Sequence, residues 1–143
     1  MKHRNSWIAL AMMSVLPLAG CGKAQVETAV AAVRPAVVAP TGDTGISRIT
    51  LTDQAMKRLG LQFALVVADG QGLALPYSAL VYDPSGGEWV YANTGLNAFQ
   101  RIRVKVERID GGKMYLSKGP AAGTSVVTVG AEELFGAEFE IGH

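Results

Sequence analysis

Short apolar runs separated by turn-forming residues make up most of the chain after residue 45. Residues 78–82 and 88–91 are rich in β-forming side chains, and they flank the sequence DPSGG at residues 83–87. Proline presets φ for a turn and glycine tolerates positive φ, so this stretch predicts a β-hairpin. Residues 46–51 alternate between apolar and polar side chains, which predicts a further strand.

A short helix is predicted next. Thr52 is a good N-cap, basic residues fall in the last turn, and Gly60 stands where a left-handed residue commonly ends a helix. The helix therefore covers residues 53–59, and residues 61–67 return as a strand. The sequence ADGQG at 68–72 is expected to form a short, flexible connection.

The longest predicted strand covers residues 99–109. Between residues 102 and 106 its even-numbered positions are apolar and its odd-numbered positions are charged, which predicts one buried and one wet face. The period breaks at 108–109, where a bulge or strand end is expected. The sequence DGG at 110–112 predicts a tight turn into a return strand at 113–117.

The last predicted elements are a buried strand at residues 125–129 and a single helical turn at 131–135, followed by an acidic, frayed tail at 136–143. About six to seven short antiparallel strands with one short helix predict a mainly β protein, a small β-barrel or β-roll.

The N-terminus has the pattern of an export signal. Lys2 and Arg4 precede an uncharged apolar run at residues 8–18, which is shorter than the ~20 residues that a membrane-spanning helix needs. The sequence LAGC at 18–21 follows and resembles the bacterial lipoprotein signal, in which the cysteine is lipidated and becomes the new N-terminus. An ordinary secretory signal and an uncleaved anchor are the alternatives.

This pattern predicts three parts of the chain. Residues 1–20 form a lipoprotein signal peptide, residues 21–45 form a lipidated N-terminus at Cys21 with a flexible Ala/Val/Pro tether, and residues 46–143 form the folded domain. The expected location is the periplasm, with the lipid inserted in the inner or the outer membrane.

Composition and charge exclude several classes. The chain has 49% hydrophobic residues and 17 glycines, which fits a turn-rich globular protein and excludes a disordered one. Of its 13 Lys and Arg residues, Lys2 and Arg4 lie in the expected signal peptide, which leaves 11 against 12 acidic residues. Such a chain lacks the basic excess of nucleic-acid-binding proteins, and its single cysteine cannot form an internal disulfide.

The sequence contains no pattern typical of catalysis. The acidic candidates all fall in turns or at helix ends: Asp53, Asp83, Asp110, Glu132 and Glu133. Met56 and Met114 are soft metal ligands, but they belong to different elements and no third soft ligand accompanies them. We therefore expect no enzyme, no cofactor and no metal site.

Five residues are candidates for docking a partner. Arg101, Arg103 and Lys105 form a basic stripe on one strand, which either protects a solvated edge from aggregation or meets an acidic partner. Tyr82 and Trp89 are either interface anchors or core residues.

Four stretches together resemble the periplasmic adaptor (membrane fusion) subunits of RND-type efflux pumps, in particular the heavy-metal efflux branch. They are residues 75–95 (LPYSALVYDPSGGEWVYANTG), 99–106 (FQRIRVKV), 110–139 (DGGKMYLSKGPAAGTSVVTVGAEELFGAEF) and 46–66 (ISRITLTDQAMKRLGLQFALV). In the family, the first and last parts of the chain build the membrane-proximal domain, which contacts the periplasmic face of the pump.

The chain departs from the family at residues 68–72. Family adaptors insert a lipoyl-like domain, an α-helical hairpin and a β-barrel domain at this point, whereas five residues stand here. The resemblance therefore implies a truncated or accessory adaptor that docks on an RND-type pump or on a full-length adaptor subunit. The alternatives are a stand-alone periplasmic lipoprotein that binds a metal ion or small ligand, and a degenerate fragment of an adaptor.

Overall fold

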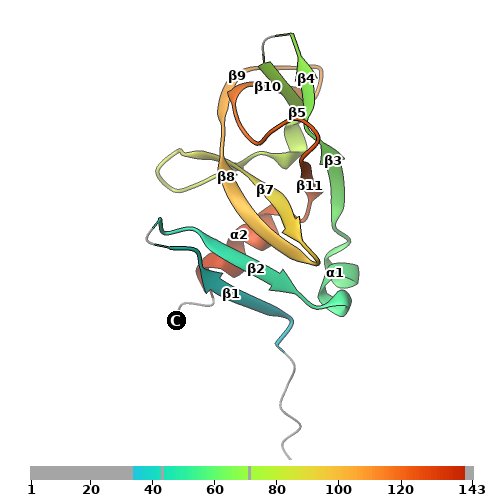
Figure 1. The fold of residues 1–143 in the computed structure, drawn as a ribbon, viewed down its shortest axis with the longest axis vertical. Helices are drawn as coiled ribbons and strands as arrows, with labels where there is room; N and C mark the ends of the chain where they lie inside the picture. Colours follow the sequence, from blue (N-terminus) through green and yellow to red (C-terminus); the bar gives the residue numbers. More distant parts are fainter. Residues whose placement is uncertain (1–33, 43, 71, 141–143) are drawn as a thin grey trace, which may run out of the picture. The chain divides into compact units, whose positions relative to one another are not determined.

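The structure is a computed structural model that describes residues 34–42, 44–70 and 72–140. In this part of the chain it contains eleven strands, two α-helices and one 3-10 turn (Figure 1). Every strand pair is antiparallel, so the predicted mainly β fold is confirmed. The expected signal peptide and the lipidation site at Cys21 lie outside the described residues.

The strands form two sheets. The seven-stranded sheet has the order β1 (Ala36–Pro40), β2 (Ser47–Leu51), β8 (Ala98–Arg103), β7 (Glu88–Gly95), β11 (Ser125–Val129) and β3 (Gln62–Leu65), with β6 (Val81–Tyr82) paired to β7. The four-stranded sheet has the order β4 (Val67–Asp69), β5 (Gly72–Pro76), β10 (Lys113–Lys118) and β9 (Lys105–Asp110). The sheets do not close into a barrel, so of the two predicted forms, a β-barrel or a β-roll, the barrel is not the one observed.

Two apolar cores result, because the middle of the seven-stranded sheet is covered on both faces. Tyr91 on β7 lies in the first core, beneath helix α2 (Ala131–Glu140), whereas Val90 lies in the second core against the smaller sheet. The first core contains Ile49, Leu51, Ala55, Val81, Tyr91, Phe99, Val127, Ala131 and Leu134. The second contains Val66, Leu75, Ala79, Val90, Ala92, Val104, Met114, Leu116 and Val126.

Two segments pass from one sheet to the other. Residues 98–110 form β8 and β9 with a break at Val104, whose N–H donates to the Glu88 carbonyl at 3.0 Å. The irregularity predicted at 108–109 corresponds to a register shift in the β9–β10 pairing between Arg108 and Val106, whereas the break at Val104 was not predicted. Residues 62–69 pass in the same way from β3 to β4 at Val66. Each segment turns between the two sheets and contributes one strand to each. In the sequence, the two strands have the pattern of one long strand.

The helix α1 (Asp53–Leu59) is confirmed with both of its caps. The Thr52 hydroxyl accepts from the Ala55 N–H at 3.1 Å, and Gly60 has φ 60°. A serine or threonine oxygen satisfies an N–H that the first helical turn leaves free, and glycine adopts the left-handed conformation without strain. Ala55 anchors the helix in the first core.

The predicted hairpin is confirmed as β6 and β7, but its first strand is shorter than predicted, because Tyr77–Ala79 form the 3-10 turn. Its loop is closed by Asp83, whose N–H donates to the Gly87 carbonyl at 2.9 Å. An added Cβ at Gly87 would collide with the Asp83 carboxylate, so the loop requires glycine at this position.

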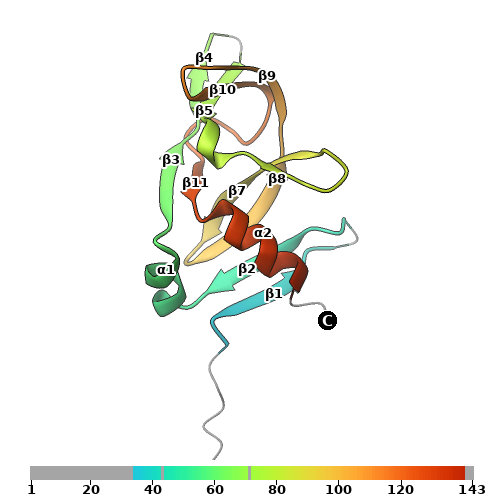
Figure 2. The ribbon, with the colours of Figure 1, turned by 180° about the vertical axis from the view of Figure 1, so that it is seen from behind.

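The C-terminal helix corrects a prediction. Helix α2 continues to Glu140 instead of ending after one turn, so residues 136–140 are not a frayed tail. It lies across the face of the seven-stranded sheet (Figure 2). The rings of Phe135 and Phe139 lie one turn apart with centroids 4.7 Å from each other, and Leu134 is fully buried.

Two other corrections concern segments expected to be flexible. Residues 36–40, assigned to the tether, form β1, which pairs with β2 along its whole length, so the folded domain begins before residue 46. The connection at 68–72 belongs to the β4–β5 hairpin, in which Val67–Asp69 pair with the start of β5. An added Cβ at Gly72 would lie 2.8 Å from the Leu116 carbonyl oxygen, so β5 packs tightly on β10 there.

Candidate functional site

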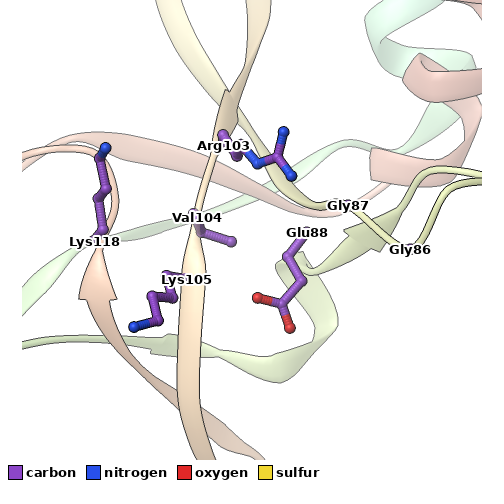
Figure 3. Close-up of a pocket in the computed structure, with 7 residues that line it drawn as sticks. All are labelled: Gly86, Gly87, Glu88, Arg103, Val104, Lys105 and Lys118. Carbon is purple, nitrogen blue, oxygen red and sulfur yellow. The ribbon is translucent and has the colours of Figure 1, made fainter.

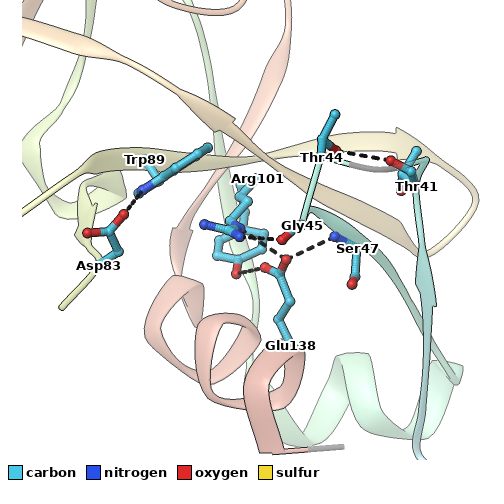
Figure 4. Close-up of polar contacts among 9 residues, drawn as sticks. Thr41, Thr44, Gly45, Ser47, Asp83, Trp89, Arg101 and Glu138 are labelled. Atoms are coloured by element: carbon cyan, nitrogen blue, oxygen red, sulfur yellow. Dashed lines mark hydrogen bonds and ion pairs between the residues drawn. The ribbon is translucent and has the colours of Figure 1, made fainter. Parts of the chain in front are cut away.

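Arg101 lies at the centre of a buried polar network beneath α2 (Figure 4). Its Nε donates to Glu138 Oε1 at 3.0 Å, and its Nη2 donates to the Gly45 carbonyl at 2.7 Å. Its guanidinium also lies over the Trp89 ring, 4.3 Å from the centroid. A guanidinium stacks well on an aromatic ring while its edge donates hydrogen bonds.

The Glu138 carboxylate is fully used. It accepts from Arg101, from the Ser47 N–H at 2.9 Å and from the Tyr91 hydroxyl at 2.6 Å. Burial raises the pKa of the Tyr91 hydroxyl strongly, and the neighbouring Glu138 carboxylate raises it further. The Tyr91 hydroxyl is therefore the donor in this hydrogen bond at neutral pH.

Asp83 holds the other edge of Trp89. Its Oδ2 accepts from the indole Nε1 at 2.8 Å, and its Oδ1 accepts from the N–H groups of Ser85 and Gly87 at 2.8 and 2.7 Å. The indole hydrogen bond first, and the Gly87 N–H second, lower the pKa of this carboxyl. Trp89 is thus fixed between Asp83 and Arg101.

The network stabilises the fold and does not form a docking surface. Arg101 and Trp89 are each only 8% exposed, so the prediction that they belong to an exposed partner-docking surface is wrong. The reason is that α2 continues far enough for Glu138 to cover this part of the strand face.

The remaining predicted docking residues lie near a surface hollow, which we call the basic hollow (Figure 3). Its volume is about 390 Å³. It is lined by Gly86, Gly87, Glu88, Arg103, Val104, Lys105 and Lys118. Since β7, β9 and β10 all contribute to it, the hollow lies where the chain turns from the larger to the smaller sheet.

The charges of the basic hollow are not balanced. Lys105 and Lys118 are register partners across an irregular part of the β9–β10 pairing, and their side chains point away from each other at the rim of the hollow (Figure 3). The ion pairs among the described residues are Arg101–Glu138 and Arg108–Asp110, so the three cations of the hollow have no ion pair in that part of the chain. Glu88 Oε2 accepts from the Val106 N–H at 2.9 Å. The hollow can therefore accept an anionic group.

Tyr82 lies beside this hollow. It is 49% exposed and is the register partner of Glu88. Partial desolvation first, then Tyr77 and Glu88, raise the pKa of its hydroxyl. Tyr77, which is also exposed, lies near the Tyr82 hydroxyl. Of the predicted docking residues, Arg103, Lys105 and Tyr82 thus lie on one surface region.

Sequence analysis missed Lys118 and Glu138. Lys118 could have been found from the two-residue turn at Gly111 and Gly112. This turn pairs Asp110 with Lys113. Counting five residues further along each strand then brings Lys105 opposite Lys118. Glu138 lies three residues after Phe135, in helical spacing, but nothing in the sequence connects it to Arg101.

The methionines considered as metal ligands lie apart. Met114 is buried in the second core, and Met56 packs against the first. Within residues 34–42, 44–70 and 72–140, no three His, Cys, Asp or Glu side chains lie close enough to hold a metal ion. No helix of these same ranges has both the length and the hydropathy to cross a membrane.

Comparison of the chain with models of protein families, with curated proteins and with solved structures gave no match.

Proposed function

We propose that this protein is a non-catalytic periplasmic lipoprotein that docks on an RND-type efflux assembly as an accessory or truncated adaptor. Its partner is the inner-membrane pump or a full-length adaptor subunit, and its lipid anchor at Cys21 keeps it at the membrane. The proposal rests on the lipoprotein-like sequence at 18–21 and on the resemblance of the folded region to adaptors.

One structural observation carries the proposal. The segments before and after the β4–β5 hairpin interleave in both sheets, with β3 paired to β11 and β5 paired to β10. The turn of this hairpin stands at the point where adaptors carry their inserted domains. Two segments that flank a large insertion in the family can therefore form one domain here without it.

The basic hollow is the surface we assign to docking. Arg103, Lys105 and Lys118 offer three positive charges without ion pairs among the described residues, and Tyr82 offers an exposed ring beside them. A partner that presents carboxylates would complement these three positive charges, and aromatic residues and arginine are enriched in interfaces.

Affinity purification tests this proposal. The tagged full-length chain, extracted from its native host in a mild detergent, should co-isolate with an RND pump or adaptor subunit. The double variant Lys105→Glu/Lys118→Glu should lose that subunit at least ~10-fold, because charge reversal turns attraction into repulsion.

The matched control is Lys57→Glu/Arg58→Glu, which reverses the same number of charges on exposed positions of α1. It should keep the partner. Absence of any pump or adaptor subunit from the parent preparation would refute the proposed function. Equal loss in both double variants would instead remove the docking role of the hollow.

A second candidate function is the binding of a small anionic ligand, which the volume of the hollow favours. Ligand pockets commonly measure about 300–1,000 Å³, and this hollow falls in that range. Calorimetry of the full chain with inorganic phosphate, with copper and with zinc separates this function from docking. Saturable phosphate binding that Lys118→Glu abolishes would favour it, whereas saturable metal binding would favour the metal-binding alternative.

A further inference from the structure

The outer edges of the two sheets differ in how well they are protected against pairing with another strand. The β1 edge lies between Pro35 and Pro40, and proline cannot donate a backbone hydrogen bond. The β9 edge is rich in charged residues and has an irregular register with β10. The β4 edge is three residues long and ends at Asp69. Charges, prolines, irregularity and short length all prevent edge-to-edge association.

The edge of β3 has no such protection. Its sequence, Gln62–Leu65, contains neither a charged residue nor proline. Phe63 is 40% exposed and Leu65 is 60% exposed, although both are large and apolar. The irregularity in the pairing with β11 lies at the Gln62 end, so the backbone from Phe63 to Leu65 is regular.

Within the described part of the chain, the backbone groups of this edge that have no partner strand belong to Phe63 and Leu65. Val66 is bonded on the β11 side, since its N–H donates to the Thr124 carbonyl at 2.9 Å and its carbonyl accepts from the Gly123 N–H at 2.8 Å. Backbone groups alternate in direction along a strand. The N–H and C=O groups of Leu65 and Phe63 therefore point away from β11.

We propose that this edge pairs with the β3 edge of a second copy of the same chain. An antiparallel arrangement with its two-fold axis at Ala64 places Phe63 of each copy opposite Leu65 of the other. Each such pair exchanges two backbone hydrogen bonds, and Phe63 and Leu65 also form an apolar cross-strand pair. The arrangement uses every open group of the regular part of β3, and the small Ala64 side chains meet at the axis.

The electrostatic match between two uncharged edges favours a second copy over an acidic or basic partner. Residues 61–68 contain no charged side chain. Beside Ala64 and Leu65 lies a cavity of about 300 Å³ that includes one carboxylate, Asp69, and one ammonium group, Lys113. An identical edge therefore brings no net repulsion. Because the contact is small beside the ~1,600 Å² of a standard interface, we expect a concentration-dependent dimer.

Disulfide trapping tests the register. Ala64→Cys in a Cys21→Ser background makes residue 64 the single thiol of the chain. Opposed residues that are not hydrogen bonded lie ~4.5 Å apart at Cα, which a disulfide can bridge. The full chain in mild detergent should form covalent dimers under mild oxidation at least ~10-fold faster than Val37→Cys in the same background. Val37 on β1 is 56% exposed, so random collision would favour this control.

Charge substitution tests the pairing itself. Leu65→Lys should convert the dimer to a monomer, as measured by sedimentation. The control Val37→Lys also replaces an exposed apolar side chain with lysine, but on β1, and should leave the dimer intact. A single-chain mass at every concentration, or equal trapping rates for the two cysteine variants, would overturn the proposal.

Hydrogen exchange distinguishes other occupants of the edge. The amides of Phe63 and Leu65 should exchange more slowly as protein concentration rises, because only the dimer protects them. Slow exchange that does not depend on concentration would mean that the chain covers its own edge, and it would overturn the proposal. This inference does not depend on the proposed function, since a pump partner is absent from all three measurements.

Discussion

Arg101 and Arg103 lie two residues apart on one face of β8, yet their environments are opposite. Arg101 is buried and bound to Glu138, whereas Arg103 is exposed beside the basic hollow. Both side chains have the same position in the alternation of the strand. Trp89 contacts both guanidinium groups, which lie 4.3 and 5.4 Å from the centroid of its ring. The difference is that Glu138 and Phe139 of α2 contact the Arg101 guanidinium, whereas Arg103 is exposed. What covers a strand face decides the role of its charges.

The two environments have different energetic consequences. A buried ion pair contributes to folding only while its hydrogen bonds are satisfied, and removal of one partner leaves an uncompensated charge in the protein interior. An exposed charge is solvated in the free protein and contributes little to stability. Substitutions at Arg101 should therefore report on folding, and substitutions at Arg103, Lys105 and Lys118 should report on binding.

The largest expected effect is that of Arg101→Ala. This variant leaves the buried Glu138 carboxylate without its cation, and we expect a loss of about 3–5 kcal/mol in the free energy of unfolding, measured by urea denaturation. Arg103→Ala should lose less than about 0.5 kcal/mol. Similar losses in the two variants would break the contrast between the buried and the exposed arginine.

Tyr91→Phe should give the next largest effect, with a pH dependence. It removes a buried hydrogen bond to a carboxylate, which costs about 1.5–3 kcal/mol at pH 7. The folded protein holds the Tyr91 proton above the ordinary pKa of about 10, whereas the unfolded chain releases it there. Stability of the parent should therefore fall as pH rises above about 10, and its advantage over Tyr91→Phe should shrink. A constant difference from pH 7 to pH 11 would contradict this account.

Asp83→Asn should give a smaller loss of stability with the opposite pH dependence. The folded state lowers the pKa of Asp83, because the ionised carboxylate accepts from Trp89, Gly87 and Ser85. Its contribution is present above the ordinary pKa of about 3.9 and is lost as pH falls further. Urea denaturation should show the largest difference between parent and variant near pH 7. Asp110→Asn, at the exposed end of β9, is the control and should show little difference, because its ion pair with Arg108 is exposed to solvent.

Local sequence features predicted the elements that local interactions stabilise. Helix α1 with Thr52 and Gly60, the β6–β7 hairpin and the tight turn at Gly111 all depend on residues that are neighbours in the chain. The phase of the strand around residues 102–106 was also predicted, since Ile102 and Val104 face the second core.

The features that the sequence did not predict depend on distant contacts. The last turn of α2 is held by contacts between Glu138 and Arg101, 37 residues away in the sequence. Gly136 interrupts the helical pattern, so the sequence predicted a helix that ends at residue 135. The strand β1 forms by pairing with β2. Its Ala/Val/Pro sequence resembles a linker when read alone, so the sequence did not predict a strand there. The same reason explains why Arg101 was placed in solvent: only α2 reveals that its strand face is covered.

The smallest expected effect, Lys118→Glu, tests the exposed side of the contrast most directly. It replaces one of the three cations that line the hollow with an anion, so we expect a gain of less than about 1 kcal/mol in stability at low salt. The gain should decrease as ionic strength rises. Lys118→Gln removes the cation without adding an anion and should give a smaller gain. Both variants should weaken docking, because this cation is one of the three that we assign to the partner. If Lys118→Glu lowered stability as Arg101→Ala is expected to do, the basic hollow would belong to the folding network and the assigned docking surface would have to lie elsewhere.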